Sequence, residues 1–331
     1  MNRFFDKVQE ITERKLTQRK AYKETLKARR TVKSEVLDWL DALAFAVIFV
    51  FLLNQYVFQM FVIPSPSMED TLLVGDRVLV NKMIYGLEVF PEGPKIFVNR
   101  TPDRDDIITF YNPRYESKGP VYSVLSQMLY MATMSLVNID VDSEGNPNEK
   151  LYVKRAAGLS GDVVCLENGD VMIRPAGLDE YEQESLYRSQ NGLSSSPSRT
   201  LDPSIYQAIN AWGRLLAYQD AGLSELAPAK LKFDYQNLDS SVSAYDYYQI
   251  SKAKALEMSY IDPSNMESRS EAAKYRIGIY VPEGYILPLG DNRDNSGDGR
   301  YFGPVSTADV NGRVVFTVWP FTRMRQLLSN T

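Results

Sequence analysis

The sequence predicts a mostly β protein, in which an antiparallel β-sheet domain with partly helical insertions follows an N-terminal transmembrane helix. Three observations predict this fold class. One long apolar run lies near the N-terminus, short β-rich runs recur after residue 70, and two stretches of different composition interrupt those runs. At 331 residues the chain is long enough for a large domain with a full core.

Residues 1–37 form the first expected segment, a basic helix. They contain eleven Lys and Arg against five Asp and Glu, and their apolar residues recur at helical spacing. Basic residues beside a membrane span stay on the cytoplasmic side. The sequence therefore predicts a cytoplasmic N-terminal helix over residues 1–37.

The apolar run supplies the second segment, a transmembrane anchor over residues 38–62. Its centre, residues 42–53, contains no polar residue. A cleavable signal peptide fits poorly, because the charged region before it is too long and no small-x-small site follows. We therefore expect a single pass through the cytoplasmic (inner) membrane, with residues 63–331 on the outer side.

Short β-rich runs bounded by Gly, Asp or Pro predict the strands of the outer domain. They are residues 74–80, 106–110, 161–166, 170–173, 277–281 and 312–318. Residues 114–149 and 177–275 lack this pattern, so we expect them to be insertions. Within the first, residues 121–139 are only moderately apolar, which favours a helix on the membrane surface or on the core over a second span.

The composition excludes several chemistries. The chain has no histidine, which removes Ser-His-Asp and Cys-His catalysis and histidine metal sites. Its one cysteine cannot form an intramolecular disulfide. The net charge of -5 argues against a nucleic-acid partner. No cofactor and no metal site are expected.

Two serines lie just after the apolar run, in the stretch IPSPSMEDTL at residues 63–72. Proline biases the residue before it toward extended backbone, and in an extended chain residues two apart face the same way. We therefore expect Ser65 and Ser67 to present both hydroxyls on one face of an extended run. A serine-bearing turn at a helix end remains an alternative from this stretch alone.

Without histidine, a serine nucleophile needs another base, and lysine is the available one. Burial against apolar groups lowers the pKa of lysine from its ordinary value of ~10.4. Lys154 lies in such a context, where a strand would place it on one face with Tyr152 and Ala156. An ordinary edge-strand lysine is the alternative interpretation.

A loop rich in Asp, Asn and Gly follows at residues 290–303. A calcium loop of the EF-hand type does not fit, because Gly303 stands where the closing Glu belongs and helical flanks are missing. A rigid loop pinned by an Asp298–Arg300 ion pair is the better interpretation, with Ser296 placed to hydrogen-bond a neighbour.

Together the three segments resemble the bacterial type I signal peptidases, also called leader peptidases, which are serine proteases with a Ser-Lys dyad. The matching motifs are IPSPSM followed by Thr71, Lys-Arg-Ala-x-Gly-x-x-Gly-Asp at 154–162 and Gly-Asp-Asn-Arg-Asp-Asn-Ser-x-Asp-x-Arg-Tyr at 290–301. The resemblance implies that Ser67 is the nucleophile and Lys154 the general base. It further implies that Ser65 donates its hydroxyl to the oxyanion and that Ser296 orients the lysine amine. Asp298 and Arg300 would support the loop.

The resemblance implies a membrane-anchored endopeptidase that removes signal peptides from exported preproteins after small residues, at A-x-A-like sites. Preprotein signal peptides and membrane lipid would be its partners. It also argues against a second span at residues 121–139, which would separate Ser67 from Lys154 across the bilayer. A self-cleaving repressor, which needs a DNA-binding domain, and a non-enzymatic membrane-tethered β scaffold that binds partners through 177–275 are the alternatives.

The chain departs from the family pattern at two positions. The family usually has proline where Asp70 stands, and Gly-Asp where this chain has Asp105-Asp106. Both departures lie near the nucleophile segment or its neighbour, so we expect them to affect the substrate pocket more than the reaction.

Overall fold

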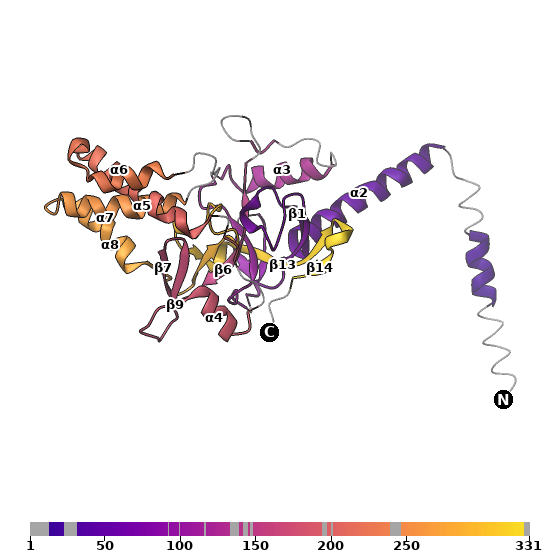
Figure 1. Ribbon diagram of the computed structural model, residues 1–331. Helices are drawn as coiled ribbons and strands as arrows, with labels where there is room; N and C mark the ends of the chain where they lie inside the picture. The colour runs from indigo at the N-terminus through magenta and orange to yellow at the C-terminus, as the bar shows by residue number, and fades with distance from the viewer. Residues whose placement is uncertain are drawn as a thin grey trace. The chain divides into compact units, whose positions relative to one another are not determined.

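The structure is a computed structural model of the whole chain (Figure 1). It describes residues 13–22, 32–91, 93–98, 100–115, 117–132, 139–141, 145, 148–193, 197–199, 201–238 and 246–327. The chain divides into two compact units, Met1–Leu52 and Leu53–Thr331.

The N-terminal unit contains the expected apolar helix. Residues 13–22 are helical, whereas 1–12 and 23–31 of the expected basic helix lie outside the described residues. The long helix α2 (Val32–Tyr56) starts in this unit and ends in the next. Its segment Val36–Tyr56 is long and apolar enough to cross a membrane by length and composition, with a mean hydropathy of 2.3 over its most apolar 18 residues.

The apolar helix does not extend as far as the expected anchor. Helix α2 ends at Tyr56, and the next residues form strand β1 (Phe58–Val62), so the expected end of the span at residue 62 is wrong. The physical reason is that these residues pair along their length with β2 (Arg77–Asn81) in the sheet. Gln55, a polar residue in the last turn of α2, is buried and donates to the carbonyl of Glu88 over 3.4 Å.

The second unit is built around an antiparallel sheet of eight strands, which confirms the predicted fold class. The strand order is β1-β2-β13-β5-β6-β11-β12, with β14 paired to β13. The remaining strands of this sheet are β5 (Ile107–Tyr111), β6 (Leu151–Gly158), β11 (Tyr285–Leu289), β12 (Val305–Ser306), β13 (Val310–Trp319) and β14 (Arg325–Gln326). Each of these pairings is antiparallel.

Two smaller sheets complete the β structure. One has the order β10-β7-β8-β9, and the other pairs β3 with β4. Their strands are β3 (Leu87–Glu88), β4 (Lys95–Ile96), β7 (Val163–Glu167), β8 (Asp170–Arg174), β9 (Glu182–Gln183) and β10 (Ile279–Tyr280). Successive residues of β6 enter different cores, because Ala156 packs with Ile108 and Phe110 whereas Ala157 packs with Val164. Strand β6 is therefore covered on both faces.

Both expected insertions contain helices. The first contains α3 (Pro120–Ala132), which at 13 residues covers much less than the roughly 20 residues of a span; residues 133–138 lie outside the description. The second contains α4 (Glu184–Gln190), α5 (Tyr206–Asp220), α6 (Ala229–Gln236), α7 (Tyr247–Ile261) and α8 (Met266–Ile277). Figure 1 shows α5 to α8 gathered in one helical group. The short helices are α9 (Gly299–Phe302), η1 (Pro66–Met68), η2 (Pro203–Ile205), η3 (Ser224–Leu226), η4 (Thr307–Asp309) and η5 (Phe321–Arg323).

Both positions that depart from the family pattern have left-handed backbone. Asp70 has φ 76° and Asp105 has φ 78°. Glycine adopts this region readily, whereas most other residues lose about 1 kcal/mol there. Asp105 therefore keeps the backbone shape that the family's glycine would allow. A proline could not adopt the turn at residue 70, because its ring fixes φ near ~-65°.

Buried ion pairs surround Asp105 and attach α4 to the sheet. Arg188 of α4 donates to Asp105, and Nη1 of Arg155 lies 3.1 Å from the same carboxylate. A second pair joins Glu184 of α4 to Arg293 over 2.6 Å. All five side chains are almost fully buried. The ion pairs of Asp105 offset the strain of its backbone and hold α4 in place.

We predict that Asp105→Gly destabilises the chain by about 3 kcal/mol, although glycine suits the backbone at this position. The reason is that two buried guanidinium groups, of Arg155 and Arg188, lose a carboxylate partner. The loss of stability in the double variant Asp105→Gly/Arg188→Leu should be smaller, by at least about 1 kcal/mol, than the sum of the losses in the two single variants. Urea midpoints of the detergent-solubilised chain measure both effects.

Asp70→Gly is the matched control, because Asp70 has nearly the same φ as Asp105 but forms none of these ion pairs. We expect its stability to stay within about 1 kcal/mol of the parent. An Asp105→Gly variant as stable as Asp70→Gly would contradict the role of the buried pairs.

Candidate active site

The two serines of the first motif meet, although not in the expected geometry. Ser65 is extended, with φ -133° and ψ 157°, as the proline after it favours. Ser67 instead lies in the 3-10 helix η1, which Pro66 can start because its fixed φ suits a first helical residue. The expectation of one extended run is therefore wrong for Ser67. Ser65 Oγ still donates to Ser67 Oγ over 3.2 Å, so the hydroxyls are adjacent.

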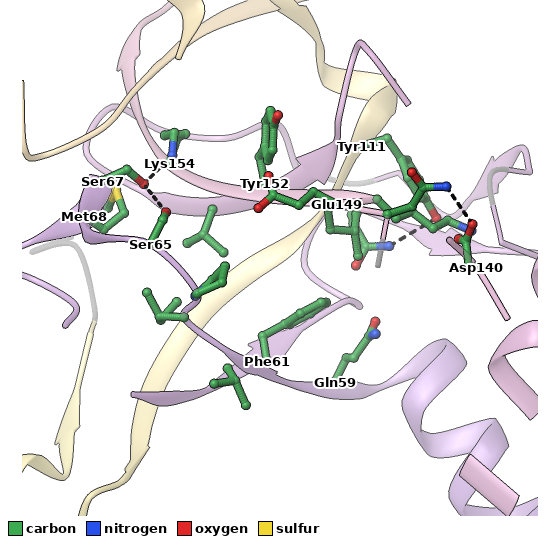
Figure 2. Close-up of a pocket in the computed structure, with 18 of the residues that line it drawn as sticks. Gln59, Phe61, Ser65, Ser67, Met68, Tyr111, Asp140, Glu149, Tyr152 and Lys154 are labelled. Carbon is green, nitrogen blue, oxygen red and sulfur yellow. Dashed lines mark hydrogen bonds between the residues drawn. The ribbon is translucent and has the colours of Figure 1, made fainter. Parts of the chain in front are cut away.

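Lys154 reaches Ser67 from the middle of the large sheet. Strand β6 lies between β5 and β11, with Lys154 opposite Ile108. The amine Nζ lies 2.6 Å from Ser67 Oγ, and the lysine is only 5% exposed. Figure 2 shows the amine and both serine hydroxyls converging at one point. The alternative of an ordinary edge-strand lysine is therefore wrong.

The surroundings of Lys154 favour a neutral amine. Burial lowers its pKa to about 8, because little water remains to solvate an ammonium. The carboxylate of Asp298 acts in the opposite direction and Arg300 supports the lowering, both through charge. The ring of Tyr152, two residues earlier on the strand, lies 5.7 Å from the amine. Lys154 can therefore act as a base at mildly alkaline pH.

The loop of the third motif runs past Ser67. The backbone N–H of Asn292 donates to the carbonyl of Ser67 over 3.2 Å. Asp298 accepts from the N–H of Gly290 over 2.9 Å and pairs with Arg300 over 2.8 Å. Although burial opposes ionisation, Arg300 holds the pKa of Asp298 below its ordinary value. The expected Asp298–Arg300 ion pair is present and closes the loop.

Ser296 lies next to the site but does not hydrogen-bond the lysine. Its Oγ is buried and has no hydrogen-bond partner among the described residues. It packs against Gly290 instead, since a Cβ on that glycine would lie 2.2 Å from Ser296 Oγ and 2.5 Å from the carbonyl O of Ser67. The expected hydrogen bond from Ser296 to Lys154 is therefore absent, because the loop directs the hydroxyl toward Gly290.

Asp291 joins the three motifs through its carboxylate. Oδ2 accepts from Thr71 Oγ1 and from Arg155 Nη2, both over 2.6 Å, and Oδ1 accepts from Arg155 Nε over 2.7 Å. Although burial opposes ionisation, Arg155 holds the pKa of Asp291 below its ordinary value. Thr71, Arg155 and Asp291 belong to the first, second and third motif. Their contact could not be predicted from the sequence, because a motif does not show which of its members touch.

The serine–lysine pair lies at one end of a cavity of about 790 Å³. Figure 2 shows Ser67 and Lys154 at that end, with Tyr111 and Asp140 at the other. Residues 61–66 and 151–154 both line the cavity. Its walls therefore include the segment just before Ser67 and the strand that carries Lys154.

The polar part of this cavity was not predicted from the sequence. It is lined by residues from outside the three motifs, among them Gln55, Gln59, Lys82, Tyr111, Ser123, Ser126, Gln127 and Lys150. Serines and a glutamine do interrupt the apolar residues 121–139, and this interruption was the one available signal. These polar residues indicated that the segment does not span the membrane. They did not indicate that polar side chains of this segment face a cavity.

We predict that Gly290→Ala lowers kcat by about 100-fold for the peptide cleavage implied by the motifs. A methyl group there must displace Ser296 and the carbonyl of Ser67, and a shift of about 1 Å at a reacting group has an effect of this size. Gly297→Ala, in the same loop, is the control because its Cβ would meet nothing within 4 Å. Equal kcat values for the two variants, both folded by circular dichroism, would contradict the close packing at Gly290.

Comparison with known proteins agrees with the motif resemblance. The family model described as signal peptidase, peptidase S26, matches residues 36–319. Signal peptidase I of Haemophilus influenzae is 25% identical over 302 residues, covering 91% of this chain and 74% of that protein. Signal peptidase I of Aquifex aeolicus is 26% identical over 272 residues, covering 81% of this chain and 78% of that protein. The chain therefore belongs to the signal peptidase family S26 and is a serine protease of the signal peptidase type.

Proposed function

We propose that this chain cleaves signal peptides from exported preproteins, with Ser67 as nucleophile and Lys154 as general base. The observation that carries the proposal is the 2.6 Å contact between Lys154 Nζ and Ser67 Oγ. The burial that lowers the pKa of Lys154 to about 8 supports it, because only the neutral amine can accept a proton.

The chemistry follows from these two groups. The neutral amine of Lys154 takes the proton of the Ser67 hydroxyl as Oγ bonds to the scissile carbonyl carbon. The resulting ammonium donates that proton to the leaving amine of the mature protein as the peptide bond breaks, which leaves an acyl-enzyme. The Lys154 amine, neutral again, takes a proton from a water molecule as the oxygen of that water attacks the ester. The signal peptide then leaves as an acid and Ser67 regains its proton.

Ser65 is placed to stabilise the oxyanion of this reaction. Its hydroxyl lies 3.2 Å from the nucleophilic oxygen, and the backbone N–H of Ser67 would supply a second donor. Losing one such donor typically reduces kcat by about 10²–10³-fold while the other donor still acts. The kcat of Ser65→Ala relative to that of Ser67→Ala therefore tests whether Ser65 assists or reacts.

The proposed substrate has small residues before the scissile bond, as in an A-x-A-like site. An extended peptide between residues 61–66 and 151–154 would bring a carbonyl carbon to Ser67. Ile63 and Met68 are almost fully buried and line the cavity near Ser67, and Val153 lines it from β6. An apolar wall suits a small apolar side chain and disfavours a charged one.

We predict that Ser67→Ala and Lys154→Met each abolish cleavage of a preprotein with an Ala-x-Ala site, without unfolding the chain. Lys95→Met is the matched control, since burial also lowers the pKa of Lys95 to about 8 but its amine donates to the backbone carbonyl of Val310. Mass spectrometry of the products maps the cleaved bond. If Lys154→Met retained cleavage at the Lys95→Met level, the dyad would be wrong.

We predict that kcat/KM rises about tenfold per pH unit below about 8 and then levels off. The sign follows from Lys154, whose neutral form is the base and whose pKa is lowered to about 8, so protonation at lower pH removes activity. The chain has no histidine to produce a limb near ~6.5. Lys95→Met should leave the profile unchanged. Activity that is already level between pH 5 and 7 would contradict the lysine base.

The same function requires the site to face outward from the cytoplasmic membrane. The eleven Lys and Arg of residues 1–37 favour a cytoplasmic N-terminus, which places the chain after one span on the outer side. We predict that protease added to intact spheroplasts cleaves an epitope within 177–275 and leaves an N-terminal epitope intact. Protection of the 177–275 epitope would contradict this orientation.

A further inference from the structure

Helix α3 has the reverse polarity of a helix on a water-exposed surface. Val121, Leu125 and Met128, spaced to share one face, are 72%, 58% and 40% exposed. On the opposite face Ser123 and Ser126 are 5% and 7% exposed. A helix packed on a core in water would bury the apolar face and expose the serines.

The buried polar face is explained by the cavity. Ser123, Ser126 and Gln127 line it, and Lys150 Nζ donates to Ser123 Oγ over 3.0 Å. The helix sequence PVYSVLSQMLYMA carries no charge, so its outer face contains nothing that water solvates strongly. The outer face therefore requires an apolar partner, and the position of α3 indicates which one.

That position is close to where the chain leaves the membrane. Gln55, in the last turn of the candidate span and within the same compact unit as α3, lines the same cavity as Ser123 and Ser126. Strand β1, the next element after the span, repeats the pattern. Its Gln59 and Phe61 line the cavity, whereas Phe58 and Met60 are exposed. Two walls of one cavity next to the span thus expose apolar side chains on their outer sides.

We propose that α3 lies in the interface of the lipid bilayer, with Val121, Leu125 and Met128 in contact with lipid and Ser123 and Ser126 facing the cavity. An uncharged amphipathic helix buries its apolar face at the boundary between headgroups and acyl chains. The lipid contact does not depend on catalysis. The second part, that this helix then forms a wall of the groove for a membrane-bound substrate, rests on the proposed function.

The lipid contact can be tested without any assay of cleavage. Leu125→Cys in a Cys165→Ala background takes a single fluorescent label, and the full chain is reconstituted in phosphatidylcholine–phosphatidylglycerol vesicles whose acyl chains carry nitroxide quenchers. Leu226→Cys is the matched control, because Leu226 is likewise an exposed leucine (72%, against 58% for Leu125) but lies in the 177–275 insertion. We expect strong quenching at residue 125 and little at residue 226. Equal, weak quenching at both positions would overturn the proposal.

A second copy of this chain is the alternative partner for the same face. It would give a disulfide-linked dimer of the unlabelled Leu125→Cys chain on oxidation in the vesicles, with no lipid quenching at residue 125. That pair of results would also overturn the proposal, whereas quenching without the dimer supports it.

The consequence for the substrate groove is tested separately. We expect Leu125→Gln to reduce kcat/KM for a preprotein embedded in the same vesicles by about tenfold, through the lost transfer of one leucine into lipid. Cleavage of a short soluble peptide should remain at the parent rate, because Leu125 faces away from the cavity. If the parent itself fails to cleave either substrate, the proposed function is wrong while the quenching result stands. Equal rates of parent and variant on the embedded preprotein would overturn the role of α3 at the groove.

Discussion

The contact between Asp291 and Arg155 is the interaction on which the geometry of the site depends. Lys154 and Arg155 are neighbours on β6 and project to opposite sides, so fixing one fixes the other. Arg155 is held by two contacts to Asp291 and by a third to Asp105. Thr71, four residues after Ser67, donates to the same Asp291 carboxylate over 2.6 Å. One buried carboxylate therefore sets the position of Lys154, of the turn that carries Ser67 and of its own loop together.

The charges around Lys154 explain why its pKa lies near 8 and not far lower. Burial alone disfavours the ammonium, and a fully buried lysine can lose several pKa units. Asp298 opposes that effect, but its carboxylate is engaged by Arg300 over 2.8 Å. An unpaired carboxylate at this position would favour a permanently protonated lysine, which could not accept a proton from Ser67. The Asp298–Arg300 pair thus allows a rigid, charged loop to lie beside Lys154, whose proposed role as base requires a neutral amine.

The sequence predicted those features whose signals are local. Apolarity along the chain indicated the span, β-rich runs indicated the strands, and the absence of histidine together with the three motifs directed attention to Ser67 and Lys154. Features that depend on distant partners could not be predicted. The residues after Tyr56 are apolar enough for a span but form β1 because β2 offers a partner. Likewise, nothing near Asp105 indicates that Arg188, 83 residues away, compensates its charge and its backbone.

The larger insertion is tied to the loop of the third motif at several points, so it is not a separate module attached to a complete enzyme. The N–H of Ser198 donates to the carbonyl of Asp291 over 2.9 Å, and Arg199 pairs with Asp294 over 3.0 Å. Glu184 binds Arg293, and Tyr248 of α7 packs in the same core as Ala157 of β6. A β scaffold that only displayed this insertion to partners would not need buried ion pairs reaching the loop beside Ser67. The same contacts hold the insertion against the loop that carries Asp291 and Asp298.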